Sequence, residues 1–532
     1  METITTLDHW LEWASSGRYS LLPYVRKYAL PPGSERLISW EQAWKHESPS
    51  SFVLESGKGG RYTFLGLSPK SMIEGKGEEG VVTVFASGER QRRTGKPLAL
   101  IKEWMQPHRA PAVLGAPKFI GGCVGFLGYD VARSIEKLPV TAYDDLSVPD
   151  YVMTLYDELW IMDHELHELY CAVHIRLEDR NGSTADQLAE LYEQAERKIE
   201  SMKCQWDRIA SVQMDEEWRA EHSRRIRRLE QESLHIDVAS IQGLRPALQE
   251  NEFIEAVRRI QSYIAQGDVF QVNLSVRQSK KLEARPEAIY EWLRLVNPSP
   301  YMGLLRYPGF QLVSGSPELL VQLEANQVRT RPIAGTRPRG MDQQEDLRLA
   351  DELIHNDKER AEHVMLVDLL RNDLGRISSY GSVRVDDFMV VETYSHVMHI
   401  VSEVKGELAQ GKDVYDVIAA VFPGGTITGA PKIRTMEIIE GLEPVRRGPY
   451  TGSIGWIDYT GNMELNIVIR TLLVTDGVGH VQAGAGIVID SAADREYIES
   501  LNKAKALWKS IELSEQCEWD AARAAGAEHK GD

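Results

Sequence analysis

Short β-branched runs closed by glycine or proline recur along most of this chain, and they constrain its fold more than any other feature. Residues 80–85 (GVVTVF) and 150–156 (DYVMTLY) are examples from the first half. In the second half, similar runs cover residues 270–277, 310–314, 319–323 and 327–333. Each has the length and composition of a strand. The chain is therefore expected to build extensive β-sheet.

Helical patterns alternate with these strands in the second half, which predicts an α/β (α+β) fold. The first such helix ends at Gly267 and carries five apolar residues at helical spacing: Phe253, Ala256, Val257, Ile260 and Ile264. Further helices are expected from about Asp342, from about Asp357, and from Asp494 to about Ile511.

Composition divides the chain into four segments. Residues 1–185 are mostly strand-like, and residues 251–513 mix strands, helices and glycine-rich loops. Residues 186–250 are charged, with Leu188, Leu191 and Tyr192 on one helical face. This helical segment is expected to connect the halves, although it could equally pack on the first one. Residues 514–532 form a polar, Ala-rich tail that is expected to fray.

Charge and hydropathy exclude several classes of protein. A net charge of −18 over 532 residues argues against a nucleic-acid partner, because phosphate backbones are bound by clustered Lys and Arg. No apolar run reaches the roughly 18 residues of a membrane span, and no signal peptide is visible. The four cysteines are scattered, which suits a reducing compartment. We expect a cytoplasmic protein without a membrane partner.

Two of the expected helices carry paired glutamates. Glu359 and Glu362 lie three residues apart in one helix, and Glu496 and Glu499 repeat this spacing in the last helix. Residues three apart share a helix face. Mg²⁺ takes one or two carboxylates with waters and substrate oxygens, which two such faces across a cleft would supply. The alternative is that each pair belongs to a solvated helix surface.

Basic residues occur in three β-like segments. Residues 330–340 (TRPIAGTRPRG) join such a segment to a rigid, cationic turn with a Gly-Thr backbone site. His396 and His399 lie in an extended stretch, and imidazole can exchange protons near neutral pH; a satisfied core histidine is the alternative. Arg470 lies in a β-branched run, where a buried guanidinium needs a core carboxylate or a substrate anion.

Two glycine-rich loops lie in the same half. Residues 423–432 (PGGTITGAPK) depart from a phosphate loop, because Ala430 follows the second key glycine where lysine is required. The helix start at Pro431 would favour a carboxylate as readily as a phosphate, or be a plain structural turn. Residues 482–488 (QAGAGIV) place glycines within a strand, which often marks a ligand close to the backbone.

Taken together, these motifs make the chain similar to the chorismate-utilising enzymes. Residues 251–513 resemble their catalytic domain, and residues 1–185 resemble the companion domain of the anthranilate synthase component I type. The resemblance is carried by residues 332–337 (PIAGTR), 357–363 (DKERAEH), 395–399 (SHVMH), 423–426 (PGGT), 429–432 (GAPK) and 483–486 (AGAG). It implies a two-domain α/β fold of packed antiparallel sheets surrounded by helices.

The resemblance also implies roles for individual residues. Glu362 and Glu499, supported by Glu359 and Glu496, would bind a Mg²⁺ ion that holds the ring carboxylate of chorismate. Glu318 and His399 would assist loss of the ring hydroxyl. The ring site would be lined by Gly335, Thr336 and Thr428. The enolpyruvyl carboxylate would contact Tyr450, Arg470, Gly484, Ala485, Gly486 and Lys503.

Gln271 indicates the nucleophile. Family members that add water carry lysine at this position, whereas glutamine is found in members that use ammonia and cannot act as a base for water. Amination at C2 with loss of pyruvate would make the chain an anthranilate synthase. Ala334 favours this branch, because many enzymes that give the 4-amino product carry lysine there. Residues 270–279, 449–456 and 464–471 resemble the folate branch more closely, and we favour an aminodeoxychorismate synthase component I.

The resemblance implies a partner as well. Ammonia is expected from a separate glutamine amidotransferase subunit, because no cysteine lies in a glycine-rich nucleophile turn. A non-catalytic metabolite-binding protein is a remote alternative, which would be expected to lack His399 or the carboxylates. Seven residues resemble those that enclose tryptophan in anthranilate synthases: Leu54, Glu55, Ser56, Pro298, Ser299, Tyr301 and Met302. In this chain the corresponding pocket could still bind tryptophan or have a purely structural role.

Overall fold

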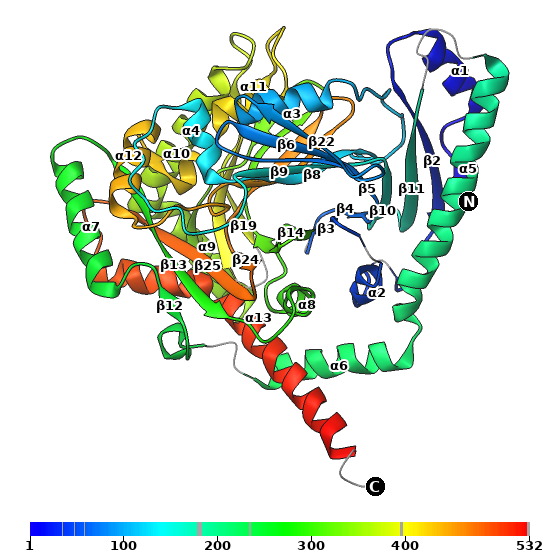
Figure 1. The fold of residues 1–532 in the computed structure, drawn as a ribbon. Helices are drawn as coiled ribbons and strands as arrows, with labels where there is room; N and C mark the ends of the chain where they lie inside the picture. Colours follow the sequence, from blue (N-terminus) through cyan, green and yellow to red (C-terminus); the bar gives the residue numbers. More distant parts are fainter. Residues whose placement is uncertain are drawn as a thin grey trace.

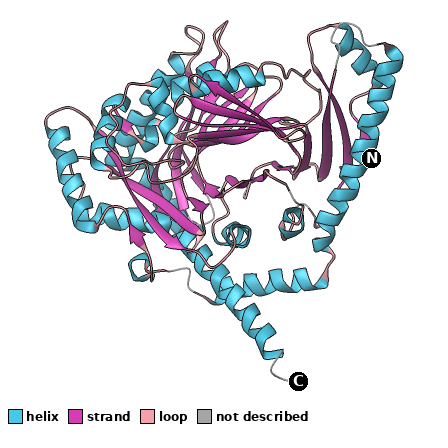
Figure 2. Ribbon diagram, in the orientation of Figure 1, coloured by secondary structure: helices cyan, strands magenta, loops and turns pink. Residues whose placement is uncertain are grey.

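Two large antiparallel sheets dominate the computed structural model of the chain, and helices cover their outer faces (Figures 1 and 2). The structure describes residues 1–34, 36–46, 48–57, 59–177, 184–232, 236–393 and 397–528. Within these ranges, side chains are described except at Thr336, Val397 and residues 518–528.

The first sheet has 13 strands within these ranges. Their order is β1 (Glu2–Thr3), β2 (Leu21–Ala29), β11 (Glu168–Arg176), β10 (Glu158–Asp163), β4 (Tyr62–Gly66), β3 (Ser51–Glu55), β14 (Tyr301–Tyr307), β15 (Phe310–Ser316), β24 (Thr471–Thr475), β25 (Val478–Ile487), β13 (Gln271–Lys281) and β12 (Arg245–Pro246), with β21 (Gly429–Ala430) also paired to β13.

The second sheet has 12 strands within the same described ranges. Their order is β18 (Ile333–Pro338), β20 (Val397–Glu407), β17 (Gln327–Thr330), β16 (Leu319–Glu324), β23 (Met463–Ile467), β22 (Ser453–Asp458), β8 (Gly122–Leu127), β9 (Tyr151–Tyr156), β5 (Pro69–Lys76), β6 (Glu79–Val84) and β7 (Glu89–Thr94), with β19 (Arg384–Thr393) also paired to β20.

The helices follow the predicted alternation. They are α1 (Leu7–Ser15), α2 (Glu41–Trp44), α3 (Pro97–Met105), α4 (Ala132–Ile135), α5 (Ala185–Ala210), α6 (Glu216–Gln231), α7 (Glu250–Ala265), α8 (Pro286–Val296), α9 (Gln343–His355), α10 (Asp357–Gly375), α11 (Val414–Val421), α12 (Lys432–Leu442) and α13 (Ala493–Glu528). No helix in the described part of the chain is both long enough and apolar enough to cross a membrane.

The layers follow from the alternation of side chains along each strand. In β14, Leu304 packs in the cluster beneath α5, α8 and α13, whereas Leu305 packs in the cluster between the sheets. Phe52 of the first sheet and Trp456 of the second also belong to this inter-sheet cluster. A third cluster lies beneath α3, α10 and α11 and includes Leu370. The predicted α/β fold of packed antiparallel sheets is confirmed.

Residues 186–250 are helical over most of their described length, as expected. The buried face of α5 packs on β11 and includes Leu188, Ile199 and Trp206. Helix α5 thus packs on the first half, whereas α6 contacts α8 of the second half through Arg225 and Trp292, so the segment also connects the halves (Figure 1). Strand pairs β3–β14 and β8–β22 join residues 1–185 to residues 251–513. The two-domain division stays a prediction, since both segments supply strands to each sheet.

The predicted end of the last helix near Ile511 is wrong. Helix α13 continues to Glu528. Residues 512–525 contain neither glycine nor proline and are rich in Glu and Ala, which are favourable in helices. Leu513 and Ser514 are also buried, at 0% and 1% exposure, so packing holds the added turn in place.

Candidate active site

The first turns of α10 carry one predicted pair of acids. The Asn356 side chain accepts a hydrogen bond from the Glu359 backbone at 3.0 Å, which fixes the start of the helix. One turn further on, Glu362 Oε1 accepts a hydrogen bond from Gln271 Nε2 of β13 at 2.9 Å. The residue predicted to select the nucleophile and a predicted metal ligand are therefore in direct contact.

The second pair lies on α13, beside the glycine-rich strand β25. Lys503 forms an ion pair with Glu499 at 2.9 Å and donates a hydrogen bond to the Gly484 carbonyl at 3.0 Å. The pairing of β24 with β25 runs only from Val478 to Val481, so residues 484–486 lie beyond it. Lys503 therefore reaches β25 where no further β24 pairing covers it.

Electrostatics connect the two acidic helices. Burial raises the pKa of Glu496, and the neighbouring Glu499 raises it further. Lys358, in the first turn of α10, lowers the same pKa, so it lies close to Glu496. Gly486 of β25 lies against the Gln271 side chain, because a Cβ at Gly486 would approach Gln271 Nε2 to 2.5 Å. The starts of α10 and α13 thus border a common region around Gln271.

The residues present fit a hard divalent cation. Repulsion between Glu496 and Glu499 would be relieved by positive charge, and carboxylate oxygens are the ligands that Mg²⁺ prefers. Among the side chains that the structure describes, no three His, Cys, Asp or Glu residues form a ready metal cluster. Mg²⁺ takes few protein ligands and keeps several waters, so two carboxylates suffice chemically. Glu499 is 53% exposed, which leaves room for such waters.

Glu318 is a buried acid that follows β15. Its side chain is 9% exposed, and Oε1 accepts a hydrogen bond from Thr426 Oγ1 at 2.8 Å. Burial raises the pKa of Glu318 to about 7, although Thr426, Arg470 and Lys503 each lower it. A carboxyl group with this pKa can hold a proton at neutral pH and give it up during a reaction.

His399 lies opposite Thr336 in the pairing of β20 with β18. Its Nδ1 lies 3.1 Å from the Gly335 carbonyl, which can only accept, so Nδ1 carries the hydrogen. Burial lowers the pKa of His399, the Gly335 carbonyl raises it, and Arg470 lowers it again. The imidazole is therefore neutral at pH 7, with Nε2 as the atom that can take a proton.

Arg470 does not lie within a strand, in contrast to the sequence prediction. It lies in the connection between β23 and β24 with φ of +49°, a left-handed conformation that is unfavourable for a side chain with Cβ. Burial lowers the pKa of Arg470, and Glu318 raises it. Glu318 is therefore one carboxyl group close to this guanidinium.

The remaining predicted ring-site residues have different surroundings. Thr428 is fully buried, and its hydroxyl donates to the Gly424 carbonyl at 3.0 Å. The Tyr450 ring lies 5.5 Å from the Arg447 guanidinium carbon, and burial raises its pKa. The side chain of Thr336, together with residues 394–396 and therefore His396, lies outside the described residues.

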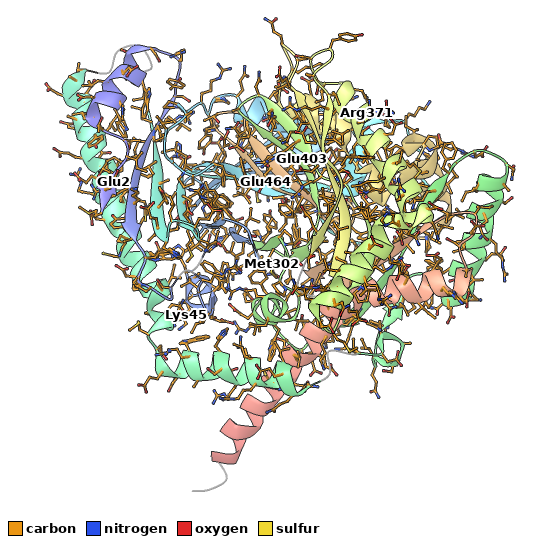
Figure 3. The ribbon with its side chains drawn as sticks, turned by 180° about the vertical axis from the view of Figure 1, so that it is seen from behind. Glu2, Lys45, Met302, Arg371, Glu403 and Glu464 are labelled. Carbon is orange, nitrogen blue, oxygen red and sulfur yellow. The ribbon has the colours of Figure 1, made fainter. Side chains whose placement is uncertain are left out.

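The segments that resemble a tryptophan pocket enclose a cavity of about 850 Å³. It lies between the sheets, and Met302, Glu403 and Glu464 in its wall are labelled in Figure 3. Its lining includes five of the seven predicted residues: Leu54, Glu55, Ser56, Tyr301 and Met302. Ser299 is buried beside it and accepts a hydrogen bond at its carbonyl from the Gly57 backbone at 2.8 Å. Pro298 precedes Ser299 and is partly buried.

Three residues near the site received no role from the sequence. Thr426 donates a hydrogen bond to Glu318, and Lys358 lowers the pKa of Glu496. His363 joins α10 to β20 by a 2.6 Å contact from Nε2 to Ser402 Oγ. All three lie inside motifs that the sequence singled out. Their partners are distant in sequence, 108 residues away for Thr426, so spacing could not assign them.

A two-sheet fold with an acidic, partly buried site of this kind places the chain in a known class. Residues 50–509 match the chorismate binding enzyme family, and the chain belongs to this family. It is 48% identical over 464 residues to aminodeoxychorismate synthase component 1 of Bacillus subtilis (strain 168), covering 87% of this chain and 92% of that protein. The predicted family is confirmed.

Anthranilate synthases are similar as well. The component 1 protein of Thermus thermophilus is 43% identical over 478 residues, covering 88% of this chain and 94% of the relative. The crystal structure of anthranilate synthase component I from Streptococcus pneumoniae TIGR4 shares the fold, with a TM-score of 0.67 and 32% identity over 84% of this chain and 92% of that one.

Proposed function

We propose that this chain aminates chorismate to 4-amino-4-deoxychorismate, for the synthesis of para-aminobenzoate and folate. The observation that carries amination is the contact from Gln271 Nε2 to Glu362. An amide at this point cannot take a proton from water, so ammonia is the nucleophile. The 48% identity to the Bacillus subtilis relative supports the 4-amino branch.

Substrate binding would use the cationic side of the site. Arg470, Lys503 and the backbone of residues 484–486 would hold the enolpyruvyl carboxylate. A Mg²⁺ ion bound by Glu362 and Glu499, with Glu359 and Glu496 in support, would neutralise the ring carboxylate and draw electron density from the ring. The ring would then lie between the acidic helices and the pair formed by Glu318 and His399.

Glu318 and His399 would move the protons. Protonated Glu318 gives its proton to the ring hydroxyl, the C–O bond breaks, and water leaves. Ammonia forms the new C–N bond, and Nε2 of His399 takes the proton that the nitrogen releases. The sum converts chorismate and ammonia to the amino product and water. The small Ala334 side chain offers no amine, so no covalent enzyme intermediate is required.

The ammonia would come from a separate glutamine amidotransferase subunit. The first two relatives are each named as component 1, which supports a partner component. Purified chain supplied with ammonium should turn over chorismate, whereas glutamine should support turnover only after the amidotransferase is added. Full glutamine-dependent turnover by the chain without a partner would contradict this part of the proposal.

Product identity tests the branch. The chain is incubated with chorismate, Mg²⁺ and ammonium, and the product is analysed by mass and by fluorescence. We expect 4-amino-4-deoxychorismate, which becomes para-aminobenzoate only after a lyase is added. Anthranilate formed without any lyase would assign the chain to the other branch. A bound but unconverted chorismate would favour the metabolite-binding alternative.

Anthranilate synthase is the second candidate, and Ala334 together with the inter-sheet cavity favours it. The cavity wall contains Glu392, which pairs with Arg331 and lies opposite His399 in the β19–β20 register. A ligand in this cavity could therefore affect the active-site strand. We expect tryptophan to leave turnover unchanged within about twofold; strong inhibition would support the anthranilate branch.

A further inference from the structure

A second cavity lies apart from the proposed chorismate site. It is found where α6 meets the C-terminal half of α13, beneath α2 and α8 (Figure 1). Its volume is about 650 Å³, within the range of small-molecule sites. Its wall contains two indoles, Trp218 and Trp292. Two further lining residues, Ser514 and Cys517, lie beyond residue 509, where the family match ends.

Positive charge predominates in the wall. Arg224 and Arg225 share one carboxylate, Glu221, at 2.8 and 3.1 Å. The Arg225 guanidinium carbon also lies 5.7 Å from the Trp292 ring centroid. Because two guanidinium groups face a single acid, this side of the cavity keeps excess positive charge next to an aromatic surface.

The other charged groups of the wall are paired. Arg285 lies 3.4 Å from Glu41, and Arg228 donates to Glu232 at 2.7 Å. Burial raises the pKa of Glu41, and its partner Arg285 lowers it. Among the described lining residues, four arginines face two acids, Glu41 and Glu221, so the arginines set the sign of the cavity.

Ser514 is the second, independent observation. Its side chain is 1% exposed, lines the cavity, and has no hydrogen-bond partner among the described residues. A buried hydroxyl without a partner destabilises the folded chain, and such groups in native proteins call for an explanation. A ligand that accepts a hydrogen bond from Ser514 Oγ would supply one.

We propose that this cavity binds a small aromatic carboxylate. The ring packs against Trp218 and Trp292, and the carboxylate accepts hydrogen bonds from Arg224, Arg225 and Ser514. Guanidinium groups match the planar carboxylate, and the indoles match a planar ring. The site is separate from the proposed chorismate site and does not depend on the proposed function.

Calorimetric titration of the full chain tests the ligand class. The probe is benzoate, with benzamide as the uncharged control and cyclohexanecarboxylate as the non-aromatic control. We expect saturable binding of benzoate, and binding of each control weaker by about tenfold or more. No binding of benzoate, or equal binding of all three compounds, would overturn the proposal.

Variants place the probe in the cavity. Arg224→Gln is expected to weaken benzoate binding by about fivefold, whereas Arg227→Gln, on the exposed face of the same helix, should change it less than about twofold. Ser514→Ala should weaken binding while Tm stays equal or rises, because the alanine leaves no unpaired hydroxyl. Unchanged binding in both Arg224→Gln and Ser514→Ala would place benzoate elsewhere and refute the site. Chorismate turnover should be unaltered in both.

Discussion

At the residue scale, Glu318 links burial to pH dependence. Its pKa of about 7 in the folded chain exceeds the ordinary value of 4.5, so the folded state binds this proton more tightly than the unfolded state. The free energy of unfolding therefore falls as pH rises from about 4.5 to about 7. Relative to wild type, Glu318→Gln should gain about 2 kcal/mol between pH 5 and pH 8, as urea unfolding would measure. A constant difference across this pH range would contradict the raised pKa.

Arg470 combines an unfavourable backbone conformation with a site position. Arg470→Gly should leave stability equal or raise it by about 1 kcal/mol, because glycine adopts φ of +49° without strain. Turnover should fall by about 100-fold or more, since the guanidinium that would bind the substrate carboxylate is lost. Thermal unfolding and steady-state kinetics provide the two readouts.

Asp476→Gly is the matched control. Asp476 also has a left-handed backbone, with φ of +50°, but lies in the turn between β24 and β25. It should show the same small gain in stability with normal turnover. A large loss of stability in Arg470→Gly would show that the guanidinium stabilises the folded chain.

The sequence proposed individual site residues but not their contacts. The roles of Glu362, Gln271 and Glu318 came from the resemblance to the chorismate-utilising enzymes, and they stay predictions. The contact of Gln271 with Glu362 and that of Thr426 with Glu318 were not predicted. Each depends on how distant segments pack, and one-dimensional spacing carries no information on that. The strand position expected for Arg470 failed for a local reason, since a β-branched run does not reveal a left-handed residue.

At the element scale, one buried contact fixes α10 against β20. His363 is fully buried, burial lowers its pKa to about 4, and Nε2 lies 2.6 Å from Ser402 Oγ. Ser402 Oγ also accepts from the Met389 backbone at 2.9 Å. Ser402→Ala would leave two buried polar groups unpaired and should lower the free energy of unfolding by about 2 kcal/mol.

This contact also bears on the site, because α10 carries Glu362 and β20 carries His399. Ser402→Ala should therefore raise the Mg²⁺ concentration needed for half-maximal turnover, in addition to lowering stability. Ser378→Ala is the matched control, since the Ser378 hydroxyl is buried without a partner in the described part of the chain. Its stability should change by less than about 0.5 kcal/mol. Equal losses of unfolding free energy in both variants would show that the Ser402 hydrogen bonds do not stabilise the chain.

Helix starts were predicted well and the last helix end was not. Caps such as Asp342 and Asn356 are local signals that a sequence shows directly. The end of α13 depends on burial of Leu513 and Ser514 against other elements, which the local pattern does not reveal. For the same reason the strands were recognised individually while their order in the two sheets was not.

At the scale of the whole molecule, both sheets are completed by strands from distant parts of the chain. β3 pairs with β14, and β8 pairs with β22, so each sheet crosses from residues 1–185 to residues 251–513. Phe52 and Phe126 from the first segment share the inter-sheet core with Leu305 and Trp456 from the second. The full chain should therefore unfold in one cooperative transition, with tryptophan fluorescence and far-ultraviolet circular dichroism changing together.

A fragment of residues 1–213 provides the sharpest test of this dependence. It keeps α5, which covers β11, and it loses β14 and β22, so β3 and β8 become unpaired edges beside an exposed apolar face. Exposed edges of this kind favour association between chains. We expect the fragment to aggregate or to unfold without a cooperative transition, as gel filtration and urea titration would show. A monomeric fragment with a sigmoidal unfolding curve would instead establish residues 1–185 as an independent domain, in the sense that the sequence predicted.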